Sequence, residues 1–268
     1  MTVLALTSTR GAPGVTTTAL ALAYSWPHPV LLVEADVSGS SSIKAGHMRG
    51  NAHPEPNLVD IALAHRNRAL TVDSLRHATI GLPLDENRLL LPGIVNSSQK
   101  ATLTPDFWDA LATVLANMAR HGYDVIIDAG RRGAIAGPQT LLDRADLVGV
   151  VTGTRLDDIV SLAANVDDIR GDDADVASHR VGAIVVGEGR PHSARQVQQA
   201  TGLTAWATIS YDAVTADRLS GGSELPTWQR LERSPLIRSA RSAVIELGRV
   251  EQRRREFLGH GHVEAAQS

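Results

Sequence analysis

The chain has 268 residues, of which 43% are hydrophobic and only 3% aromatic, with a formal net charge of -3. This length suits one large domain with a full apolar core, and the small net charge gives no overall attraction to nucleic acid or anionic lipid. The absence of cysteine excludes disulfides, thiolate metal sites, iron–sulfur clusters and cysteine nucleophiles. Neither a signal peptide nor a spanning segment is recognisable, so we expect a cytoplasmic protein.

Strand-like and helix-like segments alternate along the whole chain. In chain order we expect strands at Val3–Thr7, Val30–Val33, Leu89–Leu91, Val125–Ile127, Leu147–Val151 and Val181–Val186. We expect helices at Thr16–Tyr24, Leu58–Ala64, Asp106–Arg120 (capped by Thr104), Leu156–Ile169, His192–Thr201 and from about Pro235 towards Phe257. This alternation predicts an α/β fold, a mostly parallel twisted sheet with helices on both faces.

No internal repeat or proline-rich linker divides the chain. Residues 1–258 are therefore predicted to form one domain, followed by a disordered tail at 259–268. Within the domain, a Ser/Gly-rich loop follows the second strand as far as Gly50, and the acidic stretch Gly171–Ser178 is expected to be a surface loop.

The first strand leads directly into a glycine-bearing turn and then a helix. The segment reads Thr9-Arg10-Gly11-Ala12-Pro13-Gly14-Val15-Thr16-Thr17-Thr18. In an open α/β sheet, a turn at this place puts backbone N–H groups and a helix N-terminus around a bound anion. Gly-Xaa-Pro-Gly alone is better explained as a plain tight turn, and the surrounding residues are what favour a phosphate site.

The segment resembles the deviant phosphate loop of the MinD/ParA family of ATPases, Lys-Gly-Gly-Val-Gly-Lys-Thr-Thr. The residues that match this pattern are Gly11, Gly14, Thr16 and Thr17. Arg10 stands at the signature lysine, Ala12 at the second glycine and Val15 at the phosphate-loop lysine. An ordinary Walker register, starting at Gly11, puts Thr16 and Thr17 where Gly and Lys belong. Neither register contains the lysine.

The resemblance implies ATP and Mg²⁺ as cofactors, with the nucleotide held by residues 10–17. Lysine neutralises the β- and γ-phosphates, whereas Val15 offers neither charge nor donor, and Pro13 lacks a backbone N–H. The family's signature lysine reaches the partner's phosphates across a dimer, and Arg10 could partly replace it. Binding is therefore expected to be weakened, and hydrolysis slow or absent.

Acidic residues end two of the expected strands. Glu34-Ala35-Asp36 resembles the family's Asp-Xaa-Asp, in which the second acid orients the attacking water, so Asp36 is the catalytic candidate. Asp128 ends a strand with the form of a Walker B element, whose acid holds Mg²⁺ through water. By the same resemblance, the Thr16 hydroxyl is the direct Mg²⁺ ligand. Acids at strand ends are common, so the Glu34–Asp36 pattern is a weak signal when taken alone.

Further stretches extend the resemblance over most of the chain. Ala145–Thr152 is similar to a family strand, and Ala207–Asp212, Leu219–Gly222 and Ser234–Leu236 are similar to its C-terminal region. The family usually has an Asn that binds adenine at the end of the strand Val181–Val186, and this chain has none there. The resemblance therefore leaves adenine selectivity in doubt, with Tyr211 and Asp212 as candidate lining of the base pocket.

A basic run lies near the end of the last predicted helix. Its cations are Arg249, Arg253, Arg254 and Arg255. Contact with DNA or with a membrane is a possible reading, but the apolar residues Val250, Phe257 and Leu258 are few for a membrane helix. A solvated helix end, with the arginines balanced by Glu246, Glu251 and Glu256, is the favoured interpretation.

The leading functional hypothesis is a dimeric MinD/ParA-like organiser that partitions or positions a cellular cargo. It would form a homodimer at the nucleotide face and bind a protein cargo or adaptor. One alternative is a competent ATPase of the same family in which Arg10 supplies the missing charge. Others are a metabolic relative, such as an amidotransferase-type synthetase or a tyrosine kinase of this fold, and a scaffold that binds no nucleotide. A nitrogenase-type reductase is excluded because it needs cysteine.

Overall fold

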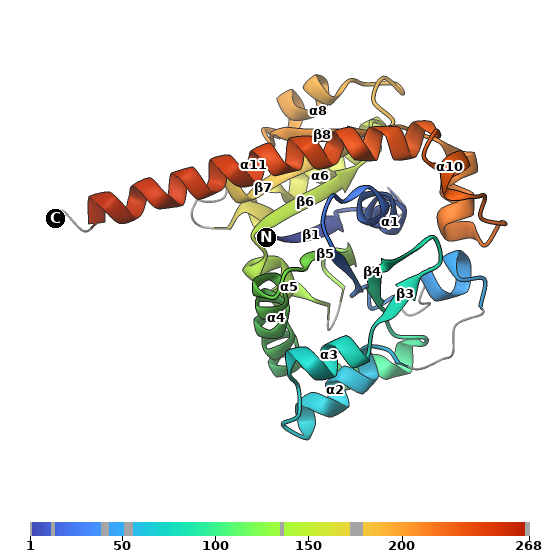
Figure 1. Ribbon diagram of the computed structural model, residues 1–268. Helices are drawn as coiled ribbons and strands as arrows, with labels where there is room; N and C mark the ends of the chain where they lie inside the picture. The colour runs from blue at the N-terminus through green and yellow to red at the C-terminus, as the bar shows by residue number, and fades with distance from the viewer. Residues whose placement is uncertain are drawn as a thin grey trace.

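The computed structural model describes residues 2–11, 14–38, 43–50, 56–134, 137–171 and 179–265. Its centre is an eight-stranded sheet in the order β3-β4-β2-β5-β1-β6-β7-β8 (Figure 1). The strands are β1 Val3–Ser8, β2 Val30–Glu34, β3 Ile80–Leu82, β4 Asp85–Leu91, β5 Asp124–Arg131, β6 Leu147–Thr152, β7 Val181–Val186 and β8 Ala205–Ile209. All neighbouring pairs are parallel except β3 with β4.

The parallel order confirms the predicted α/β class. Helices cover both faces of the sheet, and β1, β2 and β6 are entirely buried. Strands buried on both faces need apolar side chains on both faces, which is why these strands read as continuous apolar runs. The antiparallel strand β3 was not expected, since its three residues carry almost no periodic signal.

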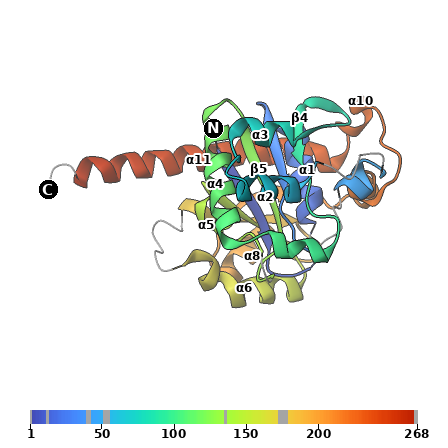
Figure 2. The same cartoon turned by 90° about the horizontal axis from the view of Figure 1, so that it is seen from below.

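Helices cover both faces of the sheet (Figures 1 and 2). The α-helices are α1 Val15–Ser25, α2 Leu58–Arg66, α3 Val72–His77, α4 Pro105–Arg120, α5 Gln139–Arg144, α6 Leu156–Arg170, α8 Ala194–Thr201, α9 Ala213–Ala216, α10 Trp228–Leu231 and α11 Pro235–Ala265. Three further short helices are η1 Ile43–His47, η2 Ser97–Thr102 and η3 Asp217–Gly221. Helices α1 and α11 pack together on one face, while α4, α6 and α8 belong to the other.

The buried residues form two apolar clusters, one on each side of the sheet. Aliphatic side chains dominate both, as the 3% aromatic content requires. Trp108 and Phe107 on α4 are the largest fully buried side chains. The predicted cap of this helix is present, because the Phe107 N–H donates to Thr104 Oγ1 (3.3 Å).

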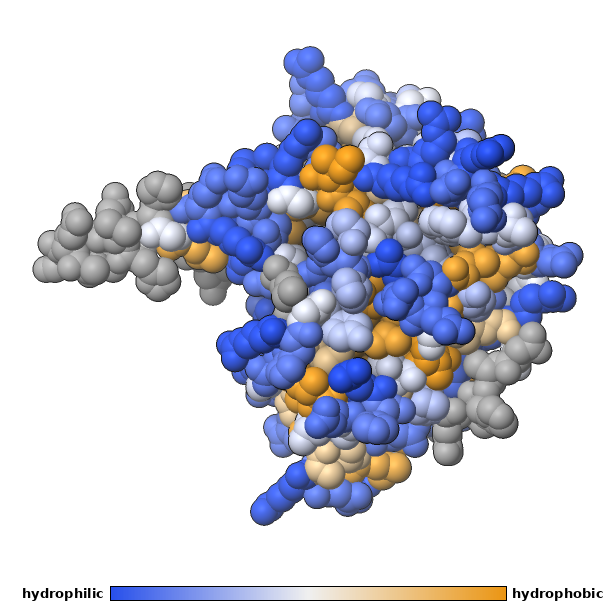
Figure 3. Space-filling model, in the orientation of Figure 1, coloured by the Kyte–Doolittle hydropathy of each residue, from blue (hydrophilic) through white to orange (hydrophobic). Residues whose placement is uncertain are grey.

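The C-terminal helix α11 crosses the sheet and then projects away from the body of the domain (Figures 1 and 2). It is one continuous helix to Ala265, past the boundary at residue 258 that the sequence analysis draws. Figure 3 shows a mainly hydrophilic face with separate apolar patches, one of them over α11. Within the described ranges, no helix combines the length and the apolar content that a bilayer crossing needs.

Candidate functional site

The carboxyl ends of the parallel strands meet at one edge of the sheet, which is where open α/β sheets bind ligands. The predicted phosphate loop lies there, between β1 and α1. Gly14 has a φ of 86°, a left-handed conformation that glycine adopts without strain, and its carbonyl accepts from the Thr18 N–H (2.8 Å). Ala12 and Pro13, two of the predicted loop residues, lie outside the described residues.

Val15 occupies the position of the missing lysine, and it is the first residue of α1. Its side chain is only 6% exposed and belongs to the apolar cluster under α1. Among the described residues of the loop, Arg10 is therefore the cation. The loop contributes backbone N–H groups and hydroxyls, but no ammonium group.

Arg10 is held within its own chain. Its guanidinium lies 2.5 Å from the Asp157 carboxylate at the start of α6, and both side chains are about half exposed. Desolvation acts to raise the pKa of Asp157, but the hydrogen bond and charge of Arg10, together with Arg155, lower it overall. In this arrangement the positive charge of Arg10 is balanced by the Asp157 carboxylate of α6.

Asp128 and Thr16, the predicted Mg²⁺ ligands, are brought together by the fold. Burial raises the pKa of the fully buried Asp128 carboxyl to about 7; a hydrogen bond from the Thr16 side chain opposes this shift, and the charge of Glu34 adds to it. The Gly130 N–H donates to Asp128 Oδ1 (3.1 Å), whereas Oδ2 has no hydrogen-bond partner within the described part of the chain.

This geometry fits a magnesium ion. A buried carboxylate oxygen without a partner is costly, and a metal-bound water would satisfy it. No group of three acidic or histidine side chains in the described ranges could hold a metal by itself. An ion here would therefore need further ligands from a bound phosphate and from water, in addition to Thr16 and Asp128.

The two acids at the end of β2 have different surroundings. Asp36, the catalytic candidate, packs against the end of β5, where a Cβ added at Gly130 would lie 2.3 Å from its Cγ. It also accepts from the Ser38 N–H (2.8 Å). Glu34 is 3% exposed and accepts from the backbone N–H groups of Ile43 and Gly93 (both 3.0 Å). Asp36 thus lies next to Asp128, while Glu34 fastens two loops to the sheet.

A pocket of about 620 Å³ opens beside the phosphate loop. Its lining joins Arg10 and Gly11 to residues after β6, β7 and β8, including Gly153, Arg190 and Tyr211. The Arg190 guanidinium lies 5.4 Å from the centre of the Tyr211 ring. Of the two residues predicted to line a base pocket, Tyr211 lines the pocket described here, whereas Asp212 caps α9 by accepting from the Thr215 N–H (3.1 Å).

Sequence reasoning missed Arg190, although Gly187, Gly189 and Pro191 around it mark a turn directly after a buried strand. A turn at the carboxyl edge of a parallel sheet is where ligands bind, and this turn could have indicated Arg190 as a candidate site residue.

The second missed feature is a contact between the loop after β2 and the segment after β8. Near the end of η1, Gly46 lies so close to η3 that an added Cβ would be 2.0 Å from the Ser220 carbonyl oxygen. The Ser220 hydroxyl also pairs with the Thr17 hydroxyl (3.0 Å). Thr17 of the phosphate loop is therefore linked through η3 to the loop that follows Asp36.

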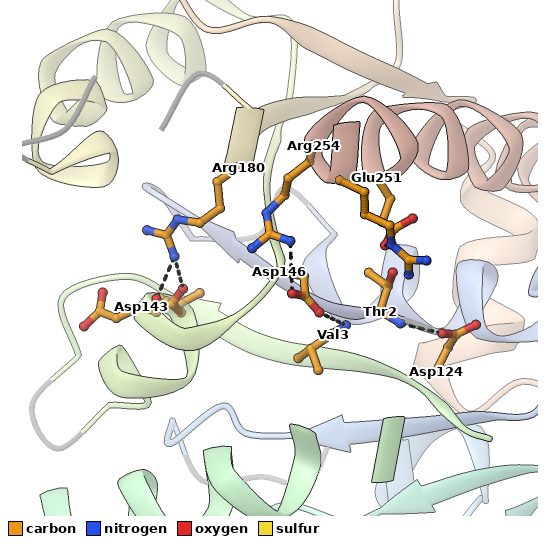
Figure 4. Close-up of polar contacts among 10 residues, drawn as sticks. Thr2, Val3, Asp124, Asp143, Asp146, Arg180, Glu251 and Arg254 are labelled. Atoms are coloured by element: carbon orange, nitrogen blue, oxygen red, sulfur yellow. Dashed lines mark hydrogen bonds and ion pairs between the residues drawn. The ribbon is translucent and has the colours of Figure 1, made fainter. Parts of the chain in front are cut away.

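The basic run on α11 is largely paired. Arg254 binds Asp146 (3.1 Å), as Figure 4 shows, and Arg249 binds Glu246 (2.5 Å). Arg255 forms an ion pair with Glu251. Of the four predicted cations, Arg253 is the one without an acidic partner among the described residues. These pairs agree with the favoured interpretation of a solvated helix end, and contact with DNA or membrane stays an untested alternative.

Known proteins resemble the chain in structure rather than in sequence. No protein-family model and no curated protein matches the sequence. The structure matches a ParA family ATPase from Chlorobium tepidum TLS, with a TM-score of 0.72, 15% identity, and coverage of 91% of this chain and 98% of that one.

Two further matches are MinD structures. The septum site-determining protein MinD from Pyrococcus horikoshii OT3, complexed with Mg-ADP, gives a TM-score of 0.68 at 17% identity, covering 92% of this chain and 95% of that one. A chain of the MinC:MinD cell division protein complex from Aquifex aeolicus gives a TM-score of 0.69 at 14% identity, covering 92% of this chain and 95% of that one. The chain therefore has the α/β fold of the MinD and ParA ATPases, as its sequence resemblance indicated.

Proposed function

We propose that the protein is a MinD/ParA-like dimeric organiser that partitions or positions a cargo, with weakened nucleotide binding and slow or absent hydrolysis. The observation that carries the proposal is the pairing of Thr16 with the buried Asp128 beside a phosphate loop whose lysine position holds a buried valine. The proposal assigns magnesium to Thr16 and Asp128, and the described residues of the loop offer no ammonium group to the phosphates.

The missing charge affects the triphosphate most. In this fold the loop lysine stabilises negative charge on the β- and γ-phosphates in the ground state and in the transition state. Arg10 is the nearest loop cation, but it already neutralises Asp157 at 2.5 Å. Recruiting Arg10 to a phosphate would break this ion pair, so we expect weak binding and little turnover. A competent ATPase that uses Arg10 remains the alternative.

A dimer through the nucleotide edge is supported by the distribution of exposed apolar side chains. Leu156 and Val160 on α6 are 66% and 65% exposed, and Tyr211 and Val214 after β8 are 59% and 62% exposed. All four follow strands that end at the carboxyl edge. Large apolar side chains gathered beside a ligand site are typical of an interface. A protein adaptor or cargo would then recognise the dimer.

The test is a calorimetric titration of ATP–Mg²⁺, with sedimentation to follow dimerisation, on the wild type, Val15→Lys and Val15→Met. The lysine variant should bind at least about tenfold more tightly, because it restores a charge-assisted contact to phosphate. The methionine variant has a similar length without the charge and should bind as weakly as the wild type.

Each other outcome removes a part of the proposal. Tight binding with normal turnover in the wild type would establish the competent ATPase. A dimer that forms equally with and without nucleotide in all three proteins would establish a scaffold.

A further inference from the structure

The pocket beside the phosphate loop contains two charged groups, Arg190 and Asp158, whose side chains have no hydrogen-bond or ion-pair partner among the described residues. No hydrogen bond or ion pair with a described residue involves the Arg190 guanidinium, which lies over the Tyr211 ring. Likewise no described residue donates to the Asp158 carboxylate, which lines the same pocket. The other cations and acids of the lining, Arg10, Arg155 and Asp157, are already paired with one another.

Arg190 and Asp158 both contact the dipeptide Gly153–Thr154, which forms part of the pocket wall. The Thr154 hydroxyl donates to the Arg190 carbonyl (2.6 Å) and lies 3.2 Å from the Gly187 carbonyl. On the neighbouring residue, a Cβ added at Gly153 would be 2.3 Å from Asp158 Oδ2, so the carboxylate rests against this glycine. These contacts fix the backbone of Arg190 and place the Asp158 carboxylate against the pocket wall, and the Arg190 guanidinium lies over the Tyr211 ring.

A planar ligand that satisfies both must offer acceptors to a guanidinium and donors to a carboxylate. Guanine does so, because its O6 and N7 accept from arginine and its N1–H and amino group donate to a carboxylate. Adenine presents an amino donor where guanine has O6, and it has no N–H at N1. The Tyr211 ring offers a stacking surface for either base.

We infer that this pocket selects guanine over adenine, so that the nucleotide of the proposed switch is GDP or GTP. The inference rests on the proposed function, because it assigns the base of a nucleotide whose phosphates lie in the adjoining loop. The pocket volume of about 620 Å³ is in the range usual for small-molecule sites.

The experiment measures dissociation constants of fluorescent ribose-labelled GDP, IDP and ADP with Mg²⁺, for the wild type and for Val15→Lys. GDP should bind at least about tenfold more tightly than ADP in whichever protein binds, since a bidentate arginine–guanine pair discriminates by this much or more. IDP, which lacks the amino group, should fall between them.

Two variants assign the preference to the named side chains. Asp158→Asn keeps the shape but adds a donor, and it should lower the GDP-to-ADP ratio severalfold, while the contacts of Arg190 with O6 and N7 remain. Arg190→Gln should favour ADP, because glutamine pairs with the N6/N7 edge of adenine. Asp167→Asn on the same helix and Arg195→Gln, both exposed and outside the pocket lining, should leave the ratio unchanged. A merely structural role of Asp158 at the start of α6 would lower stability without changing the ratio.

The outcomes separate the two proposals. Equal or tighter binding of ADP, or an unchanged ratio in Asp158→Asn and Arg190→Gln, overturns the guanine assignment and leaves the nucleotide switch standing. If neither the wild type nor Val15→Lys binds any of the three nucleotides, the proposed function fails and the guanine assignment fails with it.

Discussion

The charge of Asp128 depends on its burial at the centre of the candidate magnesium site. Because burial raises the pKa of this carboxyl to about 7, the folded protein holds its proton at a pH where the unfolded chain, with a value near 3.8, has released it. The folded state therefore binds one more proton between these values. The stabilisation is fully present below pH 3.8 and is lost as the pH rises through 7.

Replacing Asp128 by Asn should remove this dependence. Between pH 5 and 8, the free energy of unfolding of the wild type should fall relative to that of Asp128→Asn by roughly 2–3 kcal/mol. Urea unfolding at several pH values measures the difference, with Asp167→Asn as the control for an exposed carboxylate. Parallel pH curves for wild type and Asp128→Asn would show that the carboxyl is already ionised in the folded protein.

At the scale of secondary-structure elements, the short helix η1 depends on its tertiary contacts rather than on the helix propensity of its residues. It is held by burial: His47 is 1% exposed, and its Nε2 lies 2.5 Å from the Tyr24 hydroxyl of α1. Burial lowers the pKa of His47 to about 4, and a hydrogen bond with the backbone of Leu219 opposes this shift. The short helix is thus fixed between α1 and η3 by a neutral imidazole.

The sign of the pH effect at His47 is opposite to that at Asp128. The unfolded histidine gains a proton near pH 6.5, while the folded one stays neutral to about 4, so stability is lost as the pH falls through this window. His47→Gln keeps a polar partner for Tyr24 without a titrating group. From pH 8 to pH 5, the wild type should lose roughly 2 kcal/mol relative to His47→Gln in urea unfolding.

The exposed His28 provides the control for His47. His28→Gln should follow the pH curve of the wild type. If His47→Gln also follows that curve, η1 opens on protonation at little cost and is not fixed in the way described.

At the scale of the whole molecule, the two ends of the chain are joined at the amino edge of the sheet, opposite the nucleotide edge. Asp146 at the start of β6 accepts from the Val3 N–H of β1 (2.9 Å) and from Arg254 of α11 (3.1 Å), as Figure 4 shows. Nearby, Asp124 accepts from the Thr2 N–H (2.6 Å) and from the Trp26 indole (2.8 Å). The first strand and the last helix are therefore tied to the same carboxylate.

A double-mutant cycle measures this connection. The pair Asp146→Asn and Arg254→Gln should give a coupling of about 0.5–1 kcal/mol in the free energy of unfolding, because the ion pair is only partly exposed. The more exposed pair of Arg249 with Glu246 is the control and should give less than about 0.5 kcal/mol. A larger coupling in the control would mean that α11 is not anchored through Asp146.

The order of strands and helices could be predicted from the sequence because it depends on local patterns. The strand Val181–Val186 was predicted with both boundaries, and the helix predicted at Asp106–Arg120 begins one residue earlier, at Pro105. An apolar β-branched run and a Thr-Pro start are signals that act within a few residues. The strands β3 and β8 and the short helices η1 and η3 are among the elements that were not predicted, and long-range packing rather than local propensity stabilises them.

The candidate site likewise has features that local sequence patterns predict and contacts that only long-range packing produces. The sequence by itself determined that the phosphate loop has no lysine and that Thr16 and Asp128 match a magnesium pattern. Only the tertiary structure brought Thr16 against Asp128, buried Val15, paired Arg10 with Asp157 and placed Arg190 beside Asp158 in one pocket. These contacts join residues far apart along the chain, and their geometry is set by sheet order and by burial, which no local pattern encodes.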